Sequence, residues 1–385
     1  MSGLHAPPLS LYVHLPWCLR KCPYCDFNSH RLPRQPPFAA YVDALLADLD
    51  QDLELLEEPR PLISIFLGGG TPSLFPADEI ARLLAGIRDR LPLVPEAEIT
   101  LEANPGTLER GRFADYRALG VNRFSLGVQS FDPGALAALG RIHGREEALA
   151  ALSELSADPG VRFNVDLMYG LPGQDPALAL ADLEQALAHA PEHLSHYELT
   201  LEPGTPFARH PPALPGEAEM QAIEDACRRR LAQAGLKRYE VSAYARPGSE
   251  SAHNLNYWRY GDYLGIGAGA HGKITRPLEG RILRIAKQPH PGSFISSARG
   301  DGRIASLREV EGAERAFEFL LNALRLTAGF ALEDFEQRTG LSRSLILPRL
   351  DALGERGLIE RDDRQVRASA RGLELLNEIL TEFLW

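Results

Sequence analysis

Three cysteines in one eight-residue window are the residues of this sequence best suited to chemistry. Cys18, Cys22 and Cys25 directly follow an apolar segment, and thiolates are the ligands that iron–sulfur clusters require. Three ligands for four irons leave one iron open to an exchangeable small molecule. The alternative is a zinc site, but a closed zinc site needs a fourth ligand, for which only His14 and His30 lie nearby in the sequence. The spacing therefore favours a 4Fe–4S cluster.

Several polar residues stand where predicted strands end. Glu102, Gln129 and Asp166 each close an apolar segment, and a Gly-Gly-Gly-Thr turn over 68–71 follows another. Taken singly, each polar side chain is explained by a satisfied hydrogen bond or a helix cap, and the glycines by a flexible turn. Residues that close successive strands of a βα barrel meet at one mouth, however, so together they predict one ligand site.

The elements that must position these residues follow a βα pattern. Short apolar, β-branched segments alternate with amphipathic helical ones, which is typical of a parallel sheet. We therefore expect an α/β fold, an incomplete (βα)6 TIM-like barrel. Its six strands are predicted over 9–14, 63–67, 98–103, 123–129, 162–168 and 193–201.

Beyond the barrel the pattern changes. A Pro/Gly-rich stretch over 203–216 precedes a helix over 217–234, which contains the lone Cys227, and then a strand around 239–244. We assign Cys227 no function, since an isolated thiol usually behaves as a small buried apolar group. The last sixty-odd residues have a winged-helix-like, mainly helical outline. We expect a barrel over 1–215, a linker region over 216–310 and a small C-terminal domain over 311–385.

Composition limits where the protein acts and what it binds. Of 385 residues, 52 are acidic and 41 basic, a formal charge of −11, so diffuse attraction to nucleic acid is not expected. The sequence shows no secretory signal and no transmembrane segment. Four cysteines do not favour a disulfide framework. These features predict a cytoplasmic protein.

The cysteine spacing, with an aromatic residue before the last cysteine, resembles the signature of the radical S-adenosylmethionine (SAM) superfamily. The similarity extends over most of the chain, to the branch that contains oxygen-independent coproporphyrinogen III oxidase and the HemW-type haem chaperones. The resemblance implies that the open iron takes the amino and carboxylate groups of SAM, and that reduction yields a 5′-deoxyadenosyl radical.

The same resemblance assigns cofactor contacts through the motifs LEANPGT, LGVQSFD, NVDLMYGLP and LGRIHGREEA. It implies that Arg141 pairs with the SAM carboxylate, for which a guanidinium fork is suited. The implied SAM-binding residues are Tyr12, Tyr24, Gly69, Gly70, Thr71, Glu102, Gln129, Arg141 and Asp166.

Two features separate the chain from the oxidase pattern and point to a haem carrier. Phe27 stands where the oxidase has a fourth cysteine, and few residues precede Cys18. The sequence His-Asn-Leu-Asn-Tyr-Trp over 253–258 matches the HNxxYW motif of the haem chaperones, in an expected loop. The match implies His253 as an axial haem ligand, flanked by Tyr257 and Trp258. The alternative is a loop histidine whose aromatic neighbours anchor it to the core.

We therefore expect a haem chaperone that carries a 4Fe–4S cluster and SAM and delivers haem to an acceptor protein, which the sequence does not identify. The second hypothesis is a radical SAM oxidative decarboxylase acting on a porphyrinogen. A third, transcriptional regulation, follows from the winged-helix outline. From Ala331 onward, however, acidic residues outnumber basic ones, which argues against binding to nucleic acid.

Overall fold

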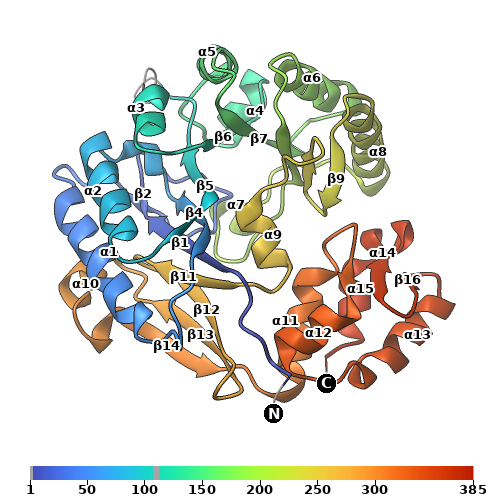
Figure 1. The fold of residues 1–385 in the computed structure, drawn as a ribbon. Helices are drawn as coiled ribbons and strands as arrows, with labels where there is room; N and C mark the ends of the chain where they lie inside the picture. The colour runs from blue at the N-terminus through green and yellow to red at the C-terminus, as the bar shows by residue number, and fades with distance from the viewer. Residues whose placement is uncertain (1–2, 107–111, 385) are drawn as a thin grey trace.

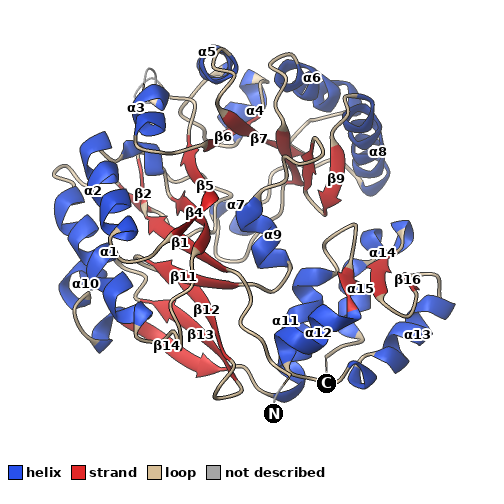
Figure 2. Cartoon of the chain, viewed as in Figure 1, coloured by secondary structure: helices blue, strands red, loops and turns tan. Residues whose placement is uncertain are grey.

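A twelve-stranded mixed sheet curves into an incomplete barrel in the computed structural model, which describes residues 3–106 and 112–384. Helices cover the outer face of the sheet, and the C-terminal domain lies beside the open side of the curve (Figure 1). Figure 2 shows that strands form the inner wall and helices the outer layer of this arc. The expected α/β barrel fold is confirmed.

The six predicted strands are parallel to one another and neighbour one another in sequence order. They are β1 (Leu9–Leu15), β4 (Leu62–Gly69), β5 (Leu93–Ala103), β6 (Arg123–Gln129), β7 (Arg162–Tyr169) and β8 (His193–Glu198). The helices between them are α1 (Phe38–Leu53), α2 (Ala77–Arg88), α3 (Phe113–Ala118), α4 (Pro133–Ala138), α5 (Arg145–Ser156) and α6 (Pro176–Leu187).

Strand alternation decides which side chains face the helices. In β1, Leu9, Leu11 and Val13 are almost fully buried and belong to the same core as Tyr41 and Leu45 of α1. Burying each such side chain contributes about 1.5–3 kcal/mol. The other residues of each strand face the barrel interior, so the same alternation delivers the functional side chains.

The region 216–310, expected as a linker, adds strands to both edges of this sheet. After α8 (Glu217–Gln233), β9 (Lys237–Glu240) and β10 (Ala243–Ala245) extend the sheet beyond β8, in place of the single strand expected around 239–244. At the other edge, β11 (Asp262–Ile266) pairs in parallel with β1. The sheet then continues antiparallel through β12 (His271–Arg276), β13 (Arg281–Lys287) and β14 (Ile304–Glu309).

The HNxxYW segment forms a short helix, α9 (Ala252–Trp258), so the prediction of a loop was wrong. The helix begins because the Ser251 hydroxyl accepts a hydrogen bond from the Asn254 amide, at 3.3 Å. It is held because the Asn256 side chain donates to Ser10 Oγ and to the Asp262 carbonyl, both at 2.9 Å. In Figure 1, α9 lies inside the arc, between the barrel strands and the C-terminal domain.

The C-terminal domain has the expected winged-helix outline. It contains α11 (Gly312–Ala323), β15 (Phe330–Ala331), α12 (Leu332–Thr339), α13 (Leu347–Glu355), β16 (Ile359–Arg361), β17 (Gln365–Ala368), α14 (Ala370–Glu374) and α15 (Leu376–Thr381). Strands β15, β17 and β16 pair in that order, around a separate core that includes Phe319, Phe335 and Leu350. The expected single final helix is divided at Leu375 into α14 and α15.

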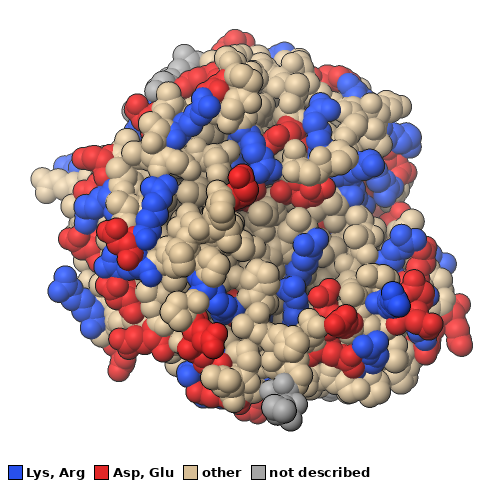
Figure 3. Space-filling model, in the orientation of Figure 1, with Lys and Arg blue, Asp and Glu red and all other residues tan. Residues whose placement is uncertain are grey.

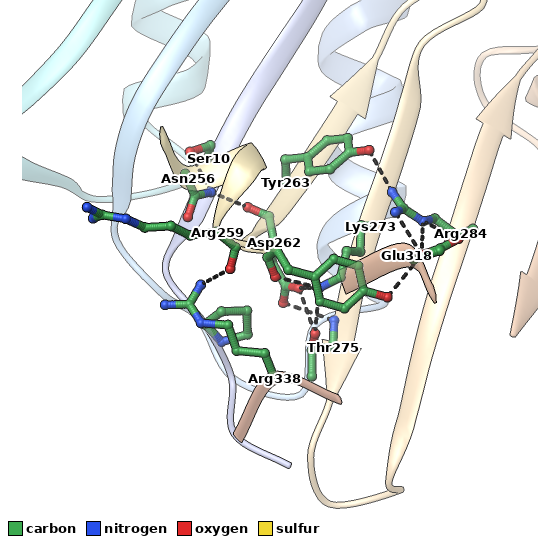
Figure 4. A network of polar contacts seen from close by, with 12 residues as sticks. Ser10, Asn256, Arg259, Asp262, Tyr263, Lys273, Thr275, Arg284, Glu318 and Arg338 are labelled. Atoms are coloured by element: carbon green, nitrogen blue, oxygen red, sulfur yellow. Dashed lines mark hydrogen bonds and ion pairs between the residues drawn. The ribbon is translucent and has the colours of Figure 1, made fainter. Parts of the chain in front are cut away.

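A buried polar network joins this domain to the barrel next to the end of α9 (Figure 4). The Asp262 carboxylate accepts from Lys273 Nζ at 2.9 Å and from Arg60 Nη2 at 2.7 Å. Beside it, the Tyr260 hydroxyl donates to Glu318 of α11, which also accepts from Arg284 of β13. The network fixes the turn that follows α9, which lies between the barrel strand starting at Asp262 and the C-terminal domain.

Candidate functional site

The barrel interior is polar, whereas a closed βα barrel of this kind would be filled by branched aliphatic residues. Sheet register arranges these side chains in layers, because Thr100 is paired with Arg123 and Glu102 with Ser125, and Asn164 is paired with His193. The upper layers lie at the carboxyl ends of the strands.

The three cysteines lie on one loop at that upper mouth. Cys18 ends the short strand β2 (Trp17–Cys18), which pairs with β3 (His30–Arg31), and the Cys25 amide donates to the Cys22 carbonyl at 3.2 Å. All three thiols are free, half-buried and line the same pocket. Burial raises the pKa of Cys18 and of Cys25, so these thiolates require a cation to replace the proton.

Within residues 3–106 and 112–384, no group of three His, Cys, Asp or Glu side chains is arranged to hold a single metal ion. The three thiols and the remaining groups of the pocket nevertheless match the donor set of a cluster with one open iron. Thr71 donates to Cys18 Sγ at 3.6 Å, and Arg141 Nη1 donates to Cys22 Sγ at 3.6 Å. Hydrogen bonds of this kind stabilise thiolate charge.

The glycine turn after β4 fits tightly against the cluster loop. A Cβ on Gly69, whose φ is +114°, would lie 2.5 Å from the His14 ring, and one on Gly70 would lie 2.6 Å from the Trp17 carbonyl. The Thr71 amide donates to that same carbonyl at 2.8 Å. Only glycine fits both positions, and the turn leaves backbone polar groups at the wall of the pocket.

Two carboxyl groups line the pocket, those of Glu102 and Asp166. Glu102 Oε2 accepts from the Gly69 amide at 3.0 Å, and Asp166 Oδ1 accepts from Asn164 Nδ2 at 2.7 Å. Burial, followed by repulsion from Asp166, raises the pKa of Glu102 to about 7. Burial likewise raises the pKa of Asp166. A cationic or hydroxyl-bearing ligand would offset both costs.

Of the cations that line the pocket, Arg20 and Lys21 are exposed, whereas Arg141 is half-buried. Its Nη2 donates to the Gly127 carbonyl at 2.7 Å and to Asn104 Oδ1, and its buried Nε has no hydrogen-bond partner among the described residues. A guanidinium with a free donor beside three thiols suits the carboxylate of an amino acid bound to the cluster.

The remaining expected SAM contacts divide into two groups. Tyr24 and Gln129 line the pocket, and Gln129, at φ +73°, accepts from the Tyr197 hydroxyl at 2.7 Å. Tyr12 does not line it; its hydroxyl is bonded to His14 Nδ1 at 2.9 Å and its ring stacks on Phe66. The structure thus brings together eight of the nine expected positions with the cysteines.

Sequence reasoning missed Asn104, Ser125 and Tyr197 as pocket residues. Asn104 lies inside the quoted motif LEANPGT, two positions after Glu102, so alternation along the strand could have identified it. Ser125 and Tyr197 also occupy alternating interior positions, but a single Ser or Tyr in an apolar segment gives little signal by itself.

The three expected haem-binding residues lie on α9, away from the cysteines. The His253 ring packs on Phe66, with ring centres 5.0 Å apart, and burial lowers the pKa of His253 to about 3. Tyr257 is 37% exposed and packs on Tyr263. Trp258 packs under the Arg325 guanidinium, 4.5 Å from its ring centre. His253 is therefore a neutral imidazole at physiological pH.

Hydrogen bonding also sets the tautomer of His253. Ser64 Oγ donates its proton to Ser10 Oγ at 2.8 Å. In its second contact, with His253 Nδ1 at 3.0 Å, the Ser64 oxygen must therefore be the acceptor. His253 then carries its proton on Nδ1, and Nε2 keeps the lone pair that a haem iron requires.

Comparison with known proteins identifies the relatives of the chain. The Radical SAM superfamily model matches residues 12–184, and the HemN C-terminal domain model matches residues 310–375. The proteins named "Heme chaperone HemW" from Escherichia coli and Haemophilus influenzae are 48% and 45% identical to the chain, and each match covers 98% of both sequences. A zebrafish protein, "Radical S-adenosyl methionine domain-containing protein 1, mitochondrial", is 36% identical over 99% of the chain and 88% of its own length.

Among solved structures, the coproporphyrinogen III oxidase HemN from Escherichia coli has the same fold, with a TM-score of 0.82 and 24% identity over 98% of the chain and 90% of its own. At that identity the likeness establishes the fold alone. The full-length matches above establish more. The chain belongs to the HemW family of the radical SAM superfamily.

Proposed function

We propose that the protein is a haem chaperone that binds haem and transfers it to an acceptor protein. The observation that carries the proposal is His253, a neutral imidazole whose Nδ1 hydrogen bond to Ser64 leaves Nε2 available for iron. The exposed Tyr257 and the half-buried Trp258 on the same helix supply apolar surface for a macrocycle. The relatives named as haem chaperones support this function.

The protein also carries a 4Fe–4S cluster and binds SAM. We assign the cluster to Cys18, Cys22 and Cys25, since these thiols share one pocket. We assign SAM binding to the other walls of that pocket, where Arg141 offers a donor to a carboxylate and Glu102 and Asp166 offer acceptors to an ammonium or hydroxyl group. Tyr12 lies outside this pocket, and its hydroxyl is bonded to His14 Nδ1.

The oxidase alternative finds less support. Phe27, 62% exposed, lines the pocket near the cysteine loop, where an oxidase-type fourth thiol would stand. A phenyl ring offers neither a ligand nor a proton. The absence of that thiol beside the cysteine pocket therefore favours the haem carrier over the oxidase.

Haem is the partner that this function requires, together with an acceptor protein that takes haem from α9. No helix in residues 3–106 and 112–384 is long and apolar enough to cross a membrane. Blue and red atoms are interspersed over the C-terminal domain and the rim of the face in Figure 3, so no field of one sign favours nucleic acid there. We place the activity in the cytoplasm, where cysteine ligands stay reduced.

The test uses purified protein with its cluster reconstituted under anaerobic conditions. We expect haem to bind near one to one with a shifted Soret band, and to pass to an apo haem protein when the two are mixed. Coproporphyrinogen should not be decarboxylated by the same preparation. Rapid decarboxylation without haem binding would overturn the proposal in favour of the oxidase.

A further inference from the structure

A second polar cavity lies inside the barrel below the cysteine pocket. The two cavities share Glu102, Ser125 and Asp166, so the lower one continues the upper one toward the amino-terminal ends of the strands. The side chains that line only the lower of the two cavities are Phe66, Thr100, Arg123, Asn164, His193 and Ser195 from the strands, and Ser251 and Asn254 at the start of α9.

Two buried donors in this cavity are unpaired. Arg123 is 2% exposed; its Nη1 donates to Glu98 at 3.4 Å and to the Ser249 carbonyl at 3.2 Å, but its Nη2 has no partner among the described residues. The Thr100 hydroxyl, 1% exposed, also has none. Leaving a buried polar atom unpaired costs about 1–3 kcal/mol. Two such atoms in one cavity indicate a ligand that brings acceptor oxygens.

Several other polar groups of the lower cavity are already paired. Asn164 Oδ1 accepts from His193 Nδ1 at 2.7 Å, and His193 Nε2 is bonded to the Tyr239 hydroxyl at 2.9 Å. Glu98 accepts from Ser251 Oγ at 3.2 Å as well as from Arg123. Among the described residues that line this cavity, Arg123 and Thr100 are the ones with a fully buried side-chain polar atom that lacks a hydrogen-bond partner.

The upper and lower cavities differ in the charge of the side chains that line them. The carboxyl groups of Glu102 and Asp166 lie where the lower cavity meets the upper one, in which SAM is proposed to bind. Sheet register places Thr100 and Arg123 one interior position lower. A guanidinium and a hydroxyl side by side can hold the two oxygens of a carboxylate. An anionic arm fits the lower end and would be repelled from the upper one.

We propose that the lower cavity binds a carboxylate arm of haem, one of its two propionates, through Arg123 Nη2 and Thr100 Oγ1. The inference rests on the proposed haem function, because it is α9 that joins the two sites. His253 lies between Ser251 and Asn254, which line the cavity, and its ring packs on Phe66, which also lines it. Haem ligated by His253 would therefore have one edge close to the cavity.

This inference is tested by measuring the affinity of two ligands for two proteins, the wild type and one variant. The ligands are haem and its dimethyl ester, which lacks both carboxylates, and the variant is Thr100→Val, which removes an unpartnered hydroxyl at nearly constant shape. The wild type should bind haem about tenfold more tightly than the ester, as loss of a hydrogen bond to a charged group requires. Thr100→Val should reduce that preference severalfold, and its melting temperature without haem should be no lower than that of the wild type, because the variant removes an unpaired buried hydroxyl.

Arg123→Lys provides a second variant that keeps the charge paired with Glu98, and it should also weaken the preference for haem over the ester. Thr381→Val, on α15, is the matched control and should behave as the wild type. An equal preference in wild type and Thr100→Val would overturn the propionate site while leaving haem binding established. Failure of the wild type to bind either porphyrin would instead overturn the proposed function.

Sodium propionate separates the two possible sources of a carboxylate. Under the proposal it should weaken haem binding by the wild type and have less effect on Thr100→Val. If it competes although haem and its ester bind equally, the occupant is a free carboxylate and the haem assignment is wrong.

Discussion

The His253 imidazole and the Ser64 hydroxyl lie 3.0 Å apart and join α9 to β4. Because Ser64 gives its own proton to Ser10, this contact selects the form of His253 that can ligate iron. A serine of β4 thus orients the proposed iron ligand, which lies on α9.

Replacing either member of this pair should change haem binding in a distinct way. His253→Ala should lose the shifted Soret band, and Ser64→Ala should keep the band but weaken affinity by about tenfold or less, since the imidazole is no longer oriented. Haem titration followed by absorbance provides the measurement. Iron and sulfide content should be unchanged in both variants, and identical spectra for His253→Ala and wild type would contradict the ligand assignment.

The cluster should depend on three cysteines and not on the fourth. Cys18→Ala, Cys22→Ala or Cys25→Ala should abolish the cluster absorbance, because each thiol lines the same pocket. Cys227, which is fully buried in the core beside α6, serves as the matched control. Its alanine variant should retain about four irons and four sulfides per chain, measured after anaerobic reconstitution. Retention of iron by a triple variant of the first three would refute the assignment.

Glu102 should make stability depend on pH. Its pKa is raised from 4.5 to about 7 in the folded chain, so folding favours the protonated form. The stabilisation is complete below pH 4.5 and disappears as pH rises through 7. Relative to Glu102→Gln, the wild type should lose on the order of 3 kcal/mol of unfolding free energy over that range. Urea denaturation without added SAM measures the difference. A constant difference across the range would show that Glu102 is not held in the protonated form.

SAM affinity should fall in Glu102→Gln, Asp166→Asn and Arg141→Gln while the cluster remains. These side chains contribute polar groups to the pocket but no thiol. Equilibrium binding of SAM to reconstituted protein provides the measurement, and iron content is the internal control. Wild-type affinity in all three variants would show that SAM binds elsewhere.

Gly69→Ala should disturb the site through the backbone alone. A Cβ at φ +114° would meet the His14 ring at 2.5 Å, so we expect about 1–3 kcal/mol of destabilisation and weaker SAM binding. Gly216→Ala is the control, because its φ is −71° and nothing lies within 4 Å of the added carbon. Thermal unfolding and SAM titration of both variants would distinguish this local clash from a general intolerance of alanine.

Asp262→Asn should destabilise the folded protein. Asp262 is fully buried and accepts from Lys273, Arg60 and Thr275, so its loss leaves two cations without their partner and costs about 3–5 kcal/mol. The exposed pair Glu360 and Arg367 is the control, and Glu360→Gln should cost less than about 1 kcal/mol. Denaturant unfolding measures both. Equal effects would show that the buried network contributes no more than a surface ion pair.

The parallel strands and the cysteine loop were predictable because each depends on local pattern. Apolar alternation located all six strands, and thiol spacing is independent of tertiary structure. The extension of the sheet past β1 by β11 was not predictable, since the pairing joins segments that are far apart in the sequence. The helix at His253 was missed for a related reason, because Asn256 holds it through Ser10 on β1. Neither contact leaves a signal in the surrounding sequence.

The position of β1 between β4 and β11 has a consequence for synthesis of the protein. The segment Leu9–Leu15 leaves the ribosome early, but one of its two edges is covered only after Asp262–Ile266 has been made. During that interval an apolar strand carries unpaired backbone groups that can pair with other chains. Nascent molecules should therefore aggregate most readily before β11 emerges, and a truncation that ends before Asp262 should need a cellular folding factor to stay in solution.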